Sequence, residues 1–198
     1  MTDIQRVRAN LRLSEKRMRH TEGVVNMAKK LAKRHFPDLP AERVELCALL
    51  HDCTKEYSLA EHLEVLAGIG ETATEEELRT PELLHARTGA VVARTVYGFD
   101  AEICDAIRHH TTGAPAMSPL ACIICLADFI EEGRTHDACV AVRGYYETQY
   151  ARLQNNQALY LALLRSLEST VSHLLETNRE ICVTSVQARN YYLNLLKD

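Results

Sequence analysis

LCALLHD, residues 46–52, is the stretch that decides how this chain is interpreted, because an apolar helical run ends in a histidine and a carboxylate. A helix that buries Leu46–Leu50 also carries His51 and Asp52 toward the interior. Burying an unpaired charge is costly, so such groups usually have a hydrogen-bonding partner or a metal ion. The same dipeptide recurs at His136-Asp137, but there it lies in a polar stretch and carries no such implication.

The composition is that of a globular protein. The 198 residues are 46% hydrophobic and 25% charged, with a formal net charge of −4, which fits one domain with a sizeable core. No block rich in lysine or arginine is present, so we expect neither DNA nor RNA as a partner. No apolar stretch is long enough to cross a membrane and no apolar signal core follows Met1, so we expect a cytoplasmic protein without membrane attachment.

The cysteines favour a reducing compartment. Their number, seven, is odd, and Cys47, Cys104, Cys122 and Cys125 fall inside apolar helical stretches, which is typical of reduced, buried thiols. Cys122 and Cys125 also have the C-x-x-C spacing of redox and zinc motifs. Since no second pair completes a zinc site, we favour core cysteines over that alternative.

The whole chain is predicted to be helical, because it has only 8 Gly and 5 Pro and no alternating apolar and polar runs. We expect one all-α domain over 1–198, with helices for a metal site at about 14–135 and supporting helices at about 137–198. The expected helices cover about 4–13, 14–35, 41–51, 58 to near 68–70, 81–97, a helix capped by Asp100, and 120–130. Asp38-Leu39-Pro40 offers a cap for the third of these, and Ser118-Pro119 precedes the last. The region from about 137 to 198 is expected to hold two or three helices, broken near Gly144 and around Asn178.

Four further polar side chains share the setting of His51 and Asp52: His20, His85, His110 and Asp128. Each lies on an apolar helical face, since residues three, four and seven positions away are mostly apolar. The neighbours concerned are Val24, Met27 and Leu31 for His20, Gly89 and Val92 for His85, Ile103, Ala106 and Ile107 for His110, and Leu120 and Ile124 for Asp128. One such residue alone is readily explained as a satisfied core histidine or a cap. All six together predict a clustered metal site.

The residue types indicate the class of metal. Imidazoles and carboxylates without clustered thiolates suit Fe, Mn, Zn or similar divalent ions. Six ligands exceed what one catalytic ion needs, and two ions that share Asp52 would use them economically. His109 is the alternative to His110, but its helical neighbours are Asp105 and Glu102, so we favour His110. The remaining histidines, His35, His62 and His173, are expected to be surface or partly buried residues.

The order of these residues, and the segments around them, resemble the HD-domain metal-dependent phosphohydrolases, and more closely their branch of symmetrical bis(5'-nucleosyl)-tetraphosphatases, the YqeK family. The resemblance covers nearly the whole chain. It is carried by residues 19–24 (RHTEGV), 49–56 (LLHDCTKE), 84–90 (LHARTGA), 106–113 (AIRHHTTG), 126–134 (LADFIEEGR) and 188–190 (ARN). One departure is His109, where many members have tyrosine.

The resemblance implies an HD-domain helical bundle that hydrolyses diadenosine tetraphosphate to two ADP at a di-iron or similar centre, with Mn, Co or Zn as other possible ions. Water activated between the metals would attack one of the two central phosphoryl groups. The implied ligand sets are His20, His51, Asp52 and Asp128 for one ion, and Asp52, His85 and His110 for the other. We expect Lys55 and Arg134 to act with Asp52 in catalysis and, with Thr111, to contact phosphate; the alternative for Lys55 and Arg134 is a solvated surface charge.

Other interpretations stay open at this stage. Another HD-type phosphohydrolase would act on nucleoside monophosphates or deoxynucleoside triphosphates, often with a single ion and a shorter ligand set. A non-catalytic protein would use the same cluster to bind a metal or nucleotide for regulation. The chain could be a monomer or a homodimer, and the apolar stretch Leu159–Leu175 could belong to the core or to a dimer seam, of which we favour the core.

Overall fold

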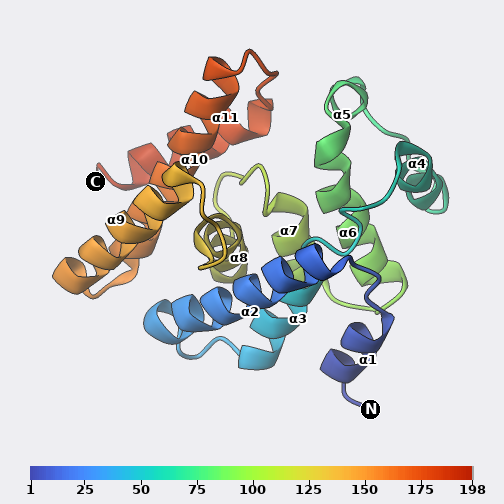
Figure 1. The fold of residues 1–198 in the computed structure, drawn as a ribbon, viewed down its shortest axis with the longest axis horizontal. Helices are drawn as coiled ribbons and strands as arrows, with labels where there is room; N and C mark the ends of the chain where they lie inside the picture. The colour runs from blue at the N-terminus through green and yellow to red at the C-terminus, as the bar shows by residue number, and fades with distance from the viewer. Residues whose placement is uncertain (198) are drawn as a thin grey trace.

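The computed structural model, which describes residues 1–197, is all-α, as the sequence predicts (Figure 1). Within those residues it contains helices and turns but no strand. The elements are α1 (Asp3–Asn10), α2 (Glu15–His35), α3 (Ala41–Leu50), α4 (Leu59–Ala67), α5 (Glu75–Arg79), the 3₁₀ turn η1 (Pro81–Leu83), α6 (Leu84–Thr95), α7 (Ala101–His109), α8 (Pro119–Ile130), α9 (Asp137–Leu153), α10 (Asn156–Glu176) and α11 (Val183–Leu195).

Side-chain caps begin α4, α7 and α8 where the sequence predicts, and α2 begins with a further one. The hydroxyl of Ser14 accepts a hydrogen bond from the N–H of Arg17 at the start of α2, and Ser58 forms a capping box with Glu61 at the start of α4. Asp100 caps α7 and Ser118 caps α8 in the same way. These caps satisfy backbone N–H groups that would otherwise lack a partner, and they fix where each chain segment enters the core.

One predicted helix break and one predicted helix cap are wrong, although α3 begins at Ala41 as predicted. Helix α9 runs through Gly144 without a break and ends at Gln154, which has a left-handed backbone with φ of 51°. Gly144 is exposed, and one exposed glycine costs a helix only about 1 kcal/mol. Asp38 does not cap α3, because the N-cap position is Pro40 and no side chain bonds there. The break around Asn178 is confirmed, since that residue is left-handed between α10 and α11.

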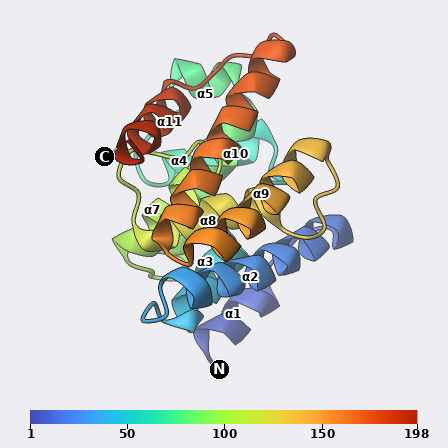
Figure 2. The ribbon, with the colours of Figure 1, turned by 90° about the vertical axis from the view of Figure 1, so that its left-hand side faces the viewer.

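Helix α8 lies at the centre of the molecule and packs against α2, α3, α7, α9 and α10 (Figures 1 and 2). Its residues Leu120–Ala127 are all buried, which explains why the sequence carries no charge there. Helices α9 to α11 cover one side of α8, while α4 to α6 lie on the other side of the molecule. The central position of α8 places Asp128, near its C-terminal end, among the ends of α2, α3 and α7.

The C-terminal helices supply packing. Leu159, Leu163 and Leu167 of α10 are buried in the same apolar cluster as the residues of α8, whereas Leu175 is exposed. The prediction that Leu159–Leu175 belongs to the core is therefore confirmed for its first half. No helix within residues 1–197 is both long and apolar enough to cross a membrane.

The cysteines are free thiols, as expected. All seven lie within the described residues and none forms a disulfide. Cys122 and Cys125 are buried in α8, and burial raises the pKa of the Cys122 thiol to about 11. Both thiols lie among the buried apolar residues of α8, so this pair belongs to the core.

Candidate metal centre

The structure brings all six of the singled-out polar residues into one buried cluster, here called the candidate metal centre. His20 comes from α2, and His51 and Asp52 lie directly after α3. His85 lies in the first turn of α6, His110 caps the C-terminus of α7, and Asp128 lies in the last turn of α8. The helical spacing that predicted the cluster therefore points these side chains inward from five separate helices.

Asp52 lies between two groups of histidines. Its Oδ2 faces His20 Nε2 at 3.8 Å and His51 Nε2 at 3.5 Å. Its Oδ1 faces His85 Nε2 at 3.2 Å and His110 Nε2 at 3.5 Å. Ligand atoms of His20, His51 and Asp52, and likewise of Asp52, His85 and His110, lie within 4.8 Å of one another. One carboxylate thus presents one oxygen to each of two candidate ion sites.

Asp128 completes one side of the cluster. Its Oδ1 lies 3.0 Å from His20 Nε2 and 3.9 Å from His51 Nε2. We call the group formed by His20, His51, Asp128 and Asp52 Oδ2 the Asp128 half. The group formed by His85, His110 and Asp52 Oδ1 is the His85 half. The Asp128 half contains two carboxylates, whereas the His85 half has only the shared one.

Backbone carbonyls hold three of the histidines in one orientation. The Nδ1 atoms of His51 and His110 lie 2.7 Å from the carbonyl oxygens of Ala48 and Ile107, and His85 Nδ1 lies 2.5 Å from that of Glu82. A carbonyl only accepts, so each Nδ1 carries the proton and each Nε2 keeps a lone pair. These three lone pairs all face Asp52.

Such an arrangement is suited to a bound cation. The Nε2 atoms of His85 and His110 lie 3.1 Å apart, and two unprotonated nitrogens at that distance repel each other. The Nε2 atom of His51 is buried and, within residues 1–197, has no hydrogen-bond partner, while that of His20 has Asp128 Oδ1 3.0 Å away. Converging lone pairs and carboxylates fit divalent metal ions, which imidazole and carboxylate ligands bind together.

Burial and charge shift the titration of the cluster. Burial tends to raise the pKa of Asp52, but His51 and the neighbouring imidazoles of His110 and His85 outweigh it, so that this carboxyl has its pKa well below the usual range. Burial lowers the pKa of His85 to about 3, and the neighbouring His110 and Lys55 act in the same direction. Asp52 is therefore ionised and His85 neutral at neutral pH, which is the state of both in a metal site.

The predicted phosphate-contacting residues border the cluster, and they lie on both sides of it. Lys55 Nζ is 3.1 Å from His85 Nε2, and Thr111 Oγ1 is 3.1 Å from the same atom. Arg134 donates from Nη2 to Asp128 Oδ1 at 2.6 Å. Burial lowers the pKa of Lys55, against the opposing charges of Asp52 and Asp128. These cations are therefore not freely solvated surface charges.

Two residues of the cluster escaped the sequence analysis. Arg17 donates to Asp52 Oδ2 at 2.7 Å, and Glu131 Oε1 lies 3.1 Å from His20 Nδ1. Arg17 precedes His20 by one helical turn and Glu131 follows Asp128 by three residues, so the same spacing argument applied to charged neighbours would have found both. With Lys16, Arg19, His20 and Arg134, these two residues line an open cavity of about 440 Å³ beside the Asp128 half.

The remaining histidines are distributed differently from the expectation. His110 lies in the cluster, while His109 faces a different hollow with Arg87 and Arg108. His35 and His62, expected at or near the surface, are buried at 6% and 4% exposure. Each has a polar partner: His35 Nε2 lies 2.9 Å from Tyr146 Oη, and His62 Nδ1 lies 2.8 Å from Thr88 Oγ1.

Comparisons with known proteins agree with this arrangement. A family model described as the HD domain matches residues 17–132. The chain is 34% identical over 170 residues to a symmetrical bis(5'-nucleosyl)-tetraphosphatase of Bacillus subtilis, which covers 85% of each chain. It is 35% identical over 184 residues to the protein of the same name from Halalkalibacterium halodurans, covering 91% of each.

A solved structure shares the fold. A protein from Clostridium acetobutylicum, described as a predicted HD superfamily hydrolase involved in NAD metabolism, superimposes with a TM-score of 0.82 at 31% sequence identity. The match covers 97% of this chain and 96% of that one. The HD domain match over residues 17–132 includes all six residues of the candidate metal centre.

Proposed function

The chain belongs to the HD domain family and to its branch of symmetrical bis(5'-nucleosyl)-tetraphosphatases, and on that premise we propose that it hydrolyses diadenosine tetraphosphate and related dinucleoside polyphosphates symmetrically, diadenosine tetraphosphate giving two ADP. The observation that carries the proposal is the position of Asp52, whose two oxygens face two separate sets of imidazoles. A single-ion phosphohydrolase needs only one of these sets.

We further propose that the cluster holds two divalent ions. His20, His51, Asp52 and Asp128 would hold one, and Asp52, His85 and His110 the other. Fe(II) is our first choice, with Mn, Co and Zn as alternatives, since all four accept these ligands. When bound, such a pair of ions neutralises phosphoryl charge and supplies a nucleophile from water at neutral pH.

The residues of the chain account for the rest of the reaction. The oxygen of water forms a bond to one inner phosphorus, and the bond from that phosphorus to the central bridging oxygen breaks, so that ADP leaves with this oxygen. Cations must offset the charge that develops on the leaving oxygens. Lys55 and Thr111 border the His85 half, and Arg17 and Arg134 border the Asp128 half.

This distribution favours a long phosphate chain. A nucleoside monophosphate would engage cations on one side of the cluster only, whereas a tetraphosphate extends to both. The open cavity lined by Lys16, Arg17 and Arg134 has room for phosphates beyond the reacting one. Charge-assisted hydrogen bonds from such groups are the strong ones in phosphate recognition.

The test is chromatographic analysis of the products formed from diadenosine tetraphosphate by the purified protein, loaded anaerobically with Fe(II) or with Mn(II). ADP as the sole product supports the proposal. AMP plus ATP would show asymmetrical cleavage and overturn the proposal. Hydrolysis of only nucleoside monophosphates or deoxynucleoside triphosphates would assign the chain to another substrate. Absence of turnover with any of these nucleotides would favour a regulatory protein.

A further inference from the structure

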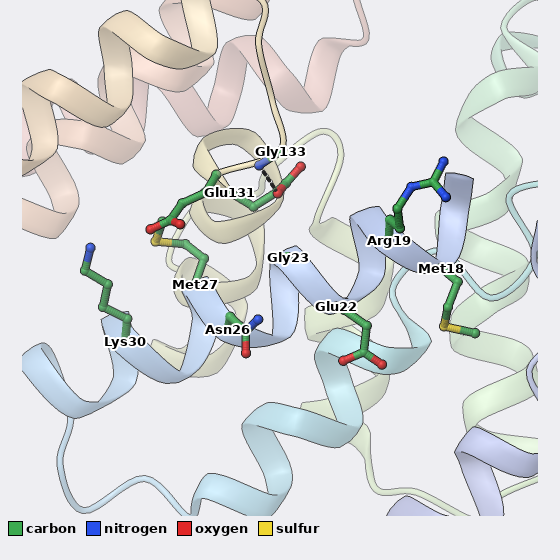
Figure 3. A pocket seen from close by; sticks show the side chains of 10 residues that line it. Met18, Arg19, Glu22, Gly23, Asn26, Met27, Lys30, Glu131 and Gly133 are labelled. Carbon is green, nitrogen blue, oxygen red and sulfur yellow. Dashed lines mark hydrogen bonds between the residues drawn. The ribbon is translucent and has the colours of Figure 1, made fainter. Parts of the chain in front are cut away.

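Glu131, directly after α8, holds a buried carboxylate for which the proposed reaction has no use. Its residue is only 3% exposed. The N–H of Gly133 donates to its Oε2 at 2.6 Å, and His20 Nδ1 lies 3.1 Å from its Oε1. Figure 3 shows this carboxylate above Gly23 of α2, with the bond to Gly133 dashed, at the edge of a cavity of about 640 Å³.

Two glycines leave the space that this carboxylate occupies. A Cβ atom at Gly23 would collide with Glu131 Oε2 and would lie 2.9 Å from Glu131 Cδ. A Cβ at Gly133 would lie 2.9 Å from Oε2 and 3.1 Å from Oε1. Neither glycine has a positive φ, so the close approach of Glu131, and not the backbone conformation, accounts for glycine at both positions.

We propose that Glu131 is a positioning residue that keeps the proton of His20 on Nδ1 and leaves the Nε2 lone pair free for a metal ion. This inference rests on the proposed metal centre. In the other three histidines, backbone carbonyls accept the hydrogen bond from Nδ1 and keep the proton there. His20 lies within helix α2, where the backbone carbonyls are engaged in the helix, and a carboxylate takes their place. Carboxylates that orient a metal-bound imidazole in this way also raise its basicity.

The isosteric variant Glu131→Gln separates this role from simple packing. The carboxylate offers two acceptor oxygens to two donors, the N–H of Gly133 and Nδ1–H of His20. Glutamine offers one oxygen and one NH₂ group. The backbone N–H of Gly133 can only donate and retains the oxygen, so the NH₂ group faces His20. The imidazole can satisfy that NH₂ only by accepting at Nδ1, which moves its proton to Nε2.

The experiment measures the tautomer of His20 by long-range ¹H–¹⁵N NMR on the metal-free, full-length protein, with the His20 signals assigned by their loss in His20→Gln. Because Asp128 Oδ1 lies 3.0 Å from His20 Nε2 and would accept a proton there, the measurement is made in an Asp128→Ala background. We expect the Nδ1–H form in this background and a shift toward the Nε2–H form when Glu131→Gln is added. Titration of the single variant Glu131→Gln with Mn(II) alone should show one of two ions bound about 10- to 100-fold more weakly, the range typical of lost outer partners. The exposed neighbour Glu132 provides the matched control, since Glu132→Gln should change neither result.

Gly23→Ala tests the same inference by a second route. Alanine favours a helix more than glycine does, yet its Cβ would displace the Glu131 carboxylate, so we expect weaker Mn(II) binding without a lower melting temperature. The inference fails if Glu131→Gln keeps the Nδ1–H tautomer and wild-type Mn(II) affinity and lowers only the melting temperature. A wild-type protein that binds no Mn(II) would instead refute the metal centre itself, while the tautomer measurement would still decide the role of Glu131.

Discussion

The two halves of the candidate metal centre share Asp52 but are built differently. The Asp128 half has a second carboxylate, an arginine on each carboxylate (Arg17 and Arg134), and His20 beside Glu131. The His85 half has two imidazoles fixed by backbone carbonyls and, within residues 1–197, Asp52 as its carboxylate. We infer that the Asp128 half binds a divalent ion more tightly, because it places two negative charges on that ion, and that the His85 half fills second.

Asp52→Asn should have the largest effect, because it removes the only charge that both halves share. We expect both ions to be lost and turnover of diadenosine tetraphosphate to fall by more than about 10³-fold, beyond what the loss of one stabilising donor costs in other enzymes. Elemental analysis and product chromatography measure the two quantities. The matched control is Asp137→Asn in the exposed His136-Asp137 pair, which should leave both unchanged.

Two variants, Asp128→Ala and His110→Ala, should each affect only one half of the candidate metal centre. Each is expected to lose one ion and to reduce turnover by about 10²-fold or more, and Asp128→Ala should leave the weaker of the two sites occupied. Mn(II) titration resolves the affinities, and circular dichroism checks that the helical content is kept. If Asp128→Ala still binds two ions with wild-type affinities, Asp128 is not a ligand and the two halves are more alike than we infer.

The cations of the two halves should affect substrate binding more than metal binding. Replacing Lys55 with Met removes a charge that lies 3.1 Å from His85 Nε2 and forms no ion pair within residues 1–197. We therefore expect about a tenfold higher KM, the equivalent of one charge-assisted hydrogen bond, with metal content unchanged. Arg134→Met removes the partner of Asp128 as well and should also weaken the ion of that half. Steady-state kinetics and metal analysis compare them, with the exposed Lys33→Met as control. Equal metal contents in all three variants would contradict the link between Arg134 and the Asp128 half.

In the metal-free protein, lowering the pH should change the stability contributions of His85 and His51 in opposite directions. Burial and nearby cations hold the pKa of His85 at about 3, below the unfolded value of about 6.5. The unfolded chain therefore binds more protons between these values, and His85 costs about 2 kcal/mol of stability at pH 5 relative to neutral pH. Although burial opposes it, the charge of Asp52 raises the pKa of His51, so protonation of His51 adds stability below about pH 6.5 that is lost as the pH rises.

Urea unfolding at pH 7 and pH 5 measures this contrast. His85→Gln should reduce the loss of stability on acidification, and His51→Gln should increase it, while the exposed His173→Gln should do neither. A change of the same sign for both variants would contradict the electrostatic difference between the halves.

The sequence predicts which polar side chains meet in this cluster, for a simple reason. Candidate ligands such as His20 and Asp128 interrupt apolar helical faces, and helical spacing shows which way a side chain points. That they bind metal ions stays a prediction. It is less informative about what surrounds them. The role of Glu131 depends on the missing side chain of Gly23, far away in the sequence, and the burial of His35 depends on Tyr146 from α9. Such contacts are tertiary, and no local pattern encodes them.

The same limit applies to the fold. Caps such as Asp100 and Ser118 act on the next few residues, so the helix starts they predict are found in the structure. The predicted break at Gly144 is wrong because packing along α9 outweighs the small intrinsic cost of one glycine. That the whole chain is a single domain stays a prediction.

The most direct test of the central claim is a crystal structure of the protein loaded with Mn(II), with the ions located by anomalous scattering. The account predicts two peaks about 3.5–4 Å apart, one among His20, His51, Asp52 and Asp128, and the other among Asp52, His85 and His110. A single peak at full occupancy, or two ions that do not share Asp52, would contradict it.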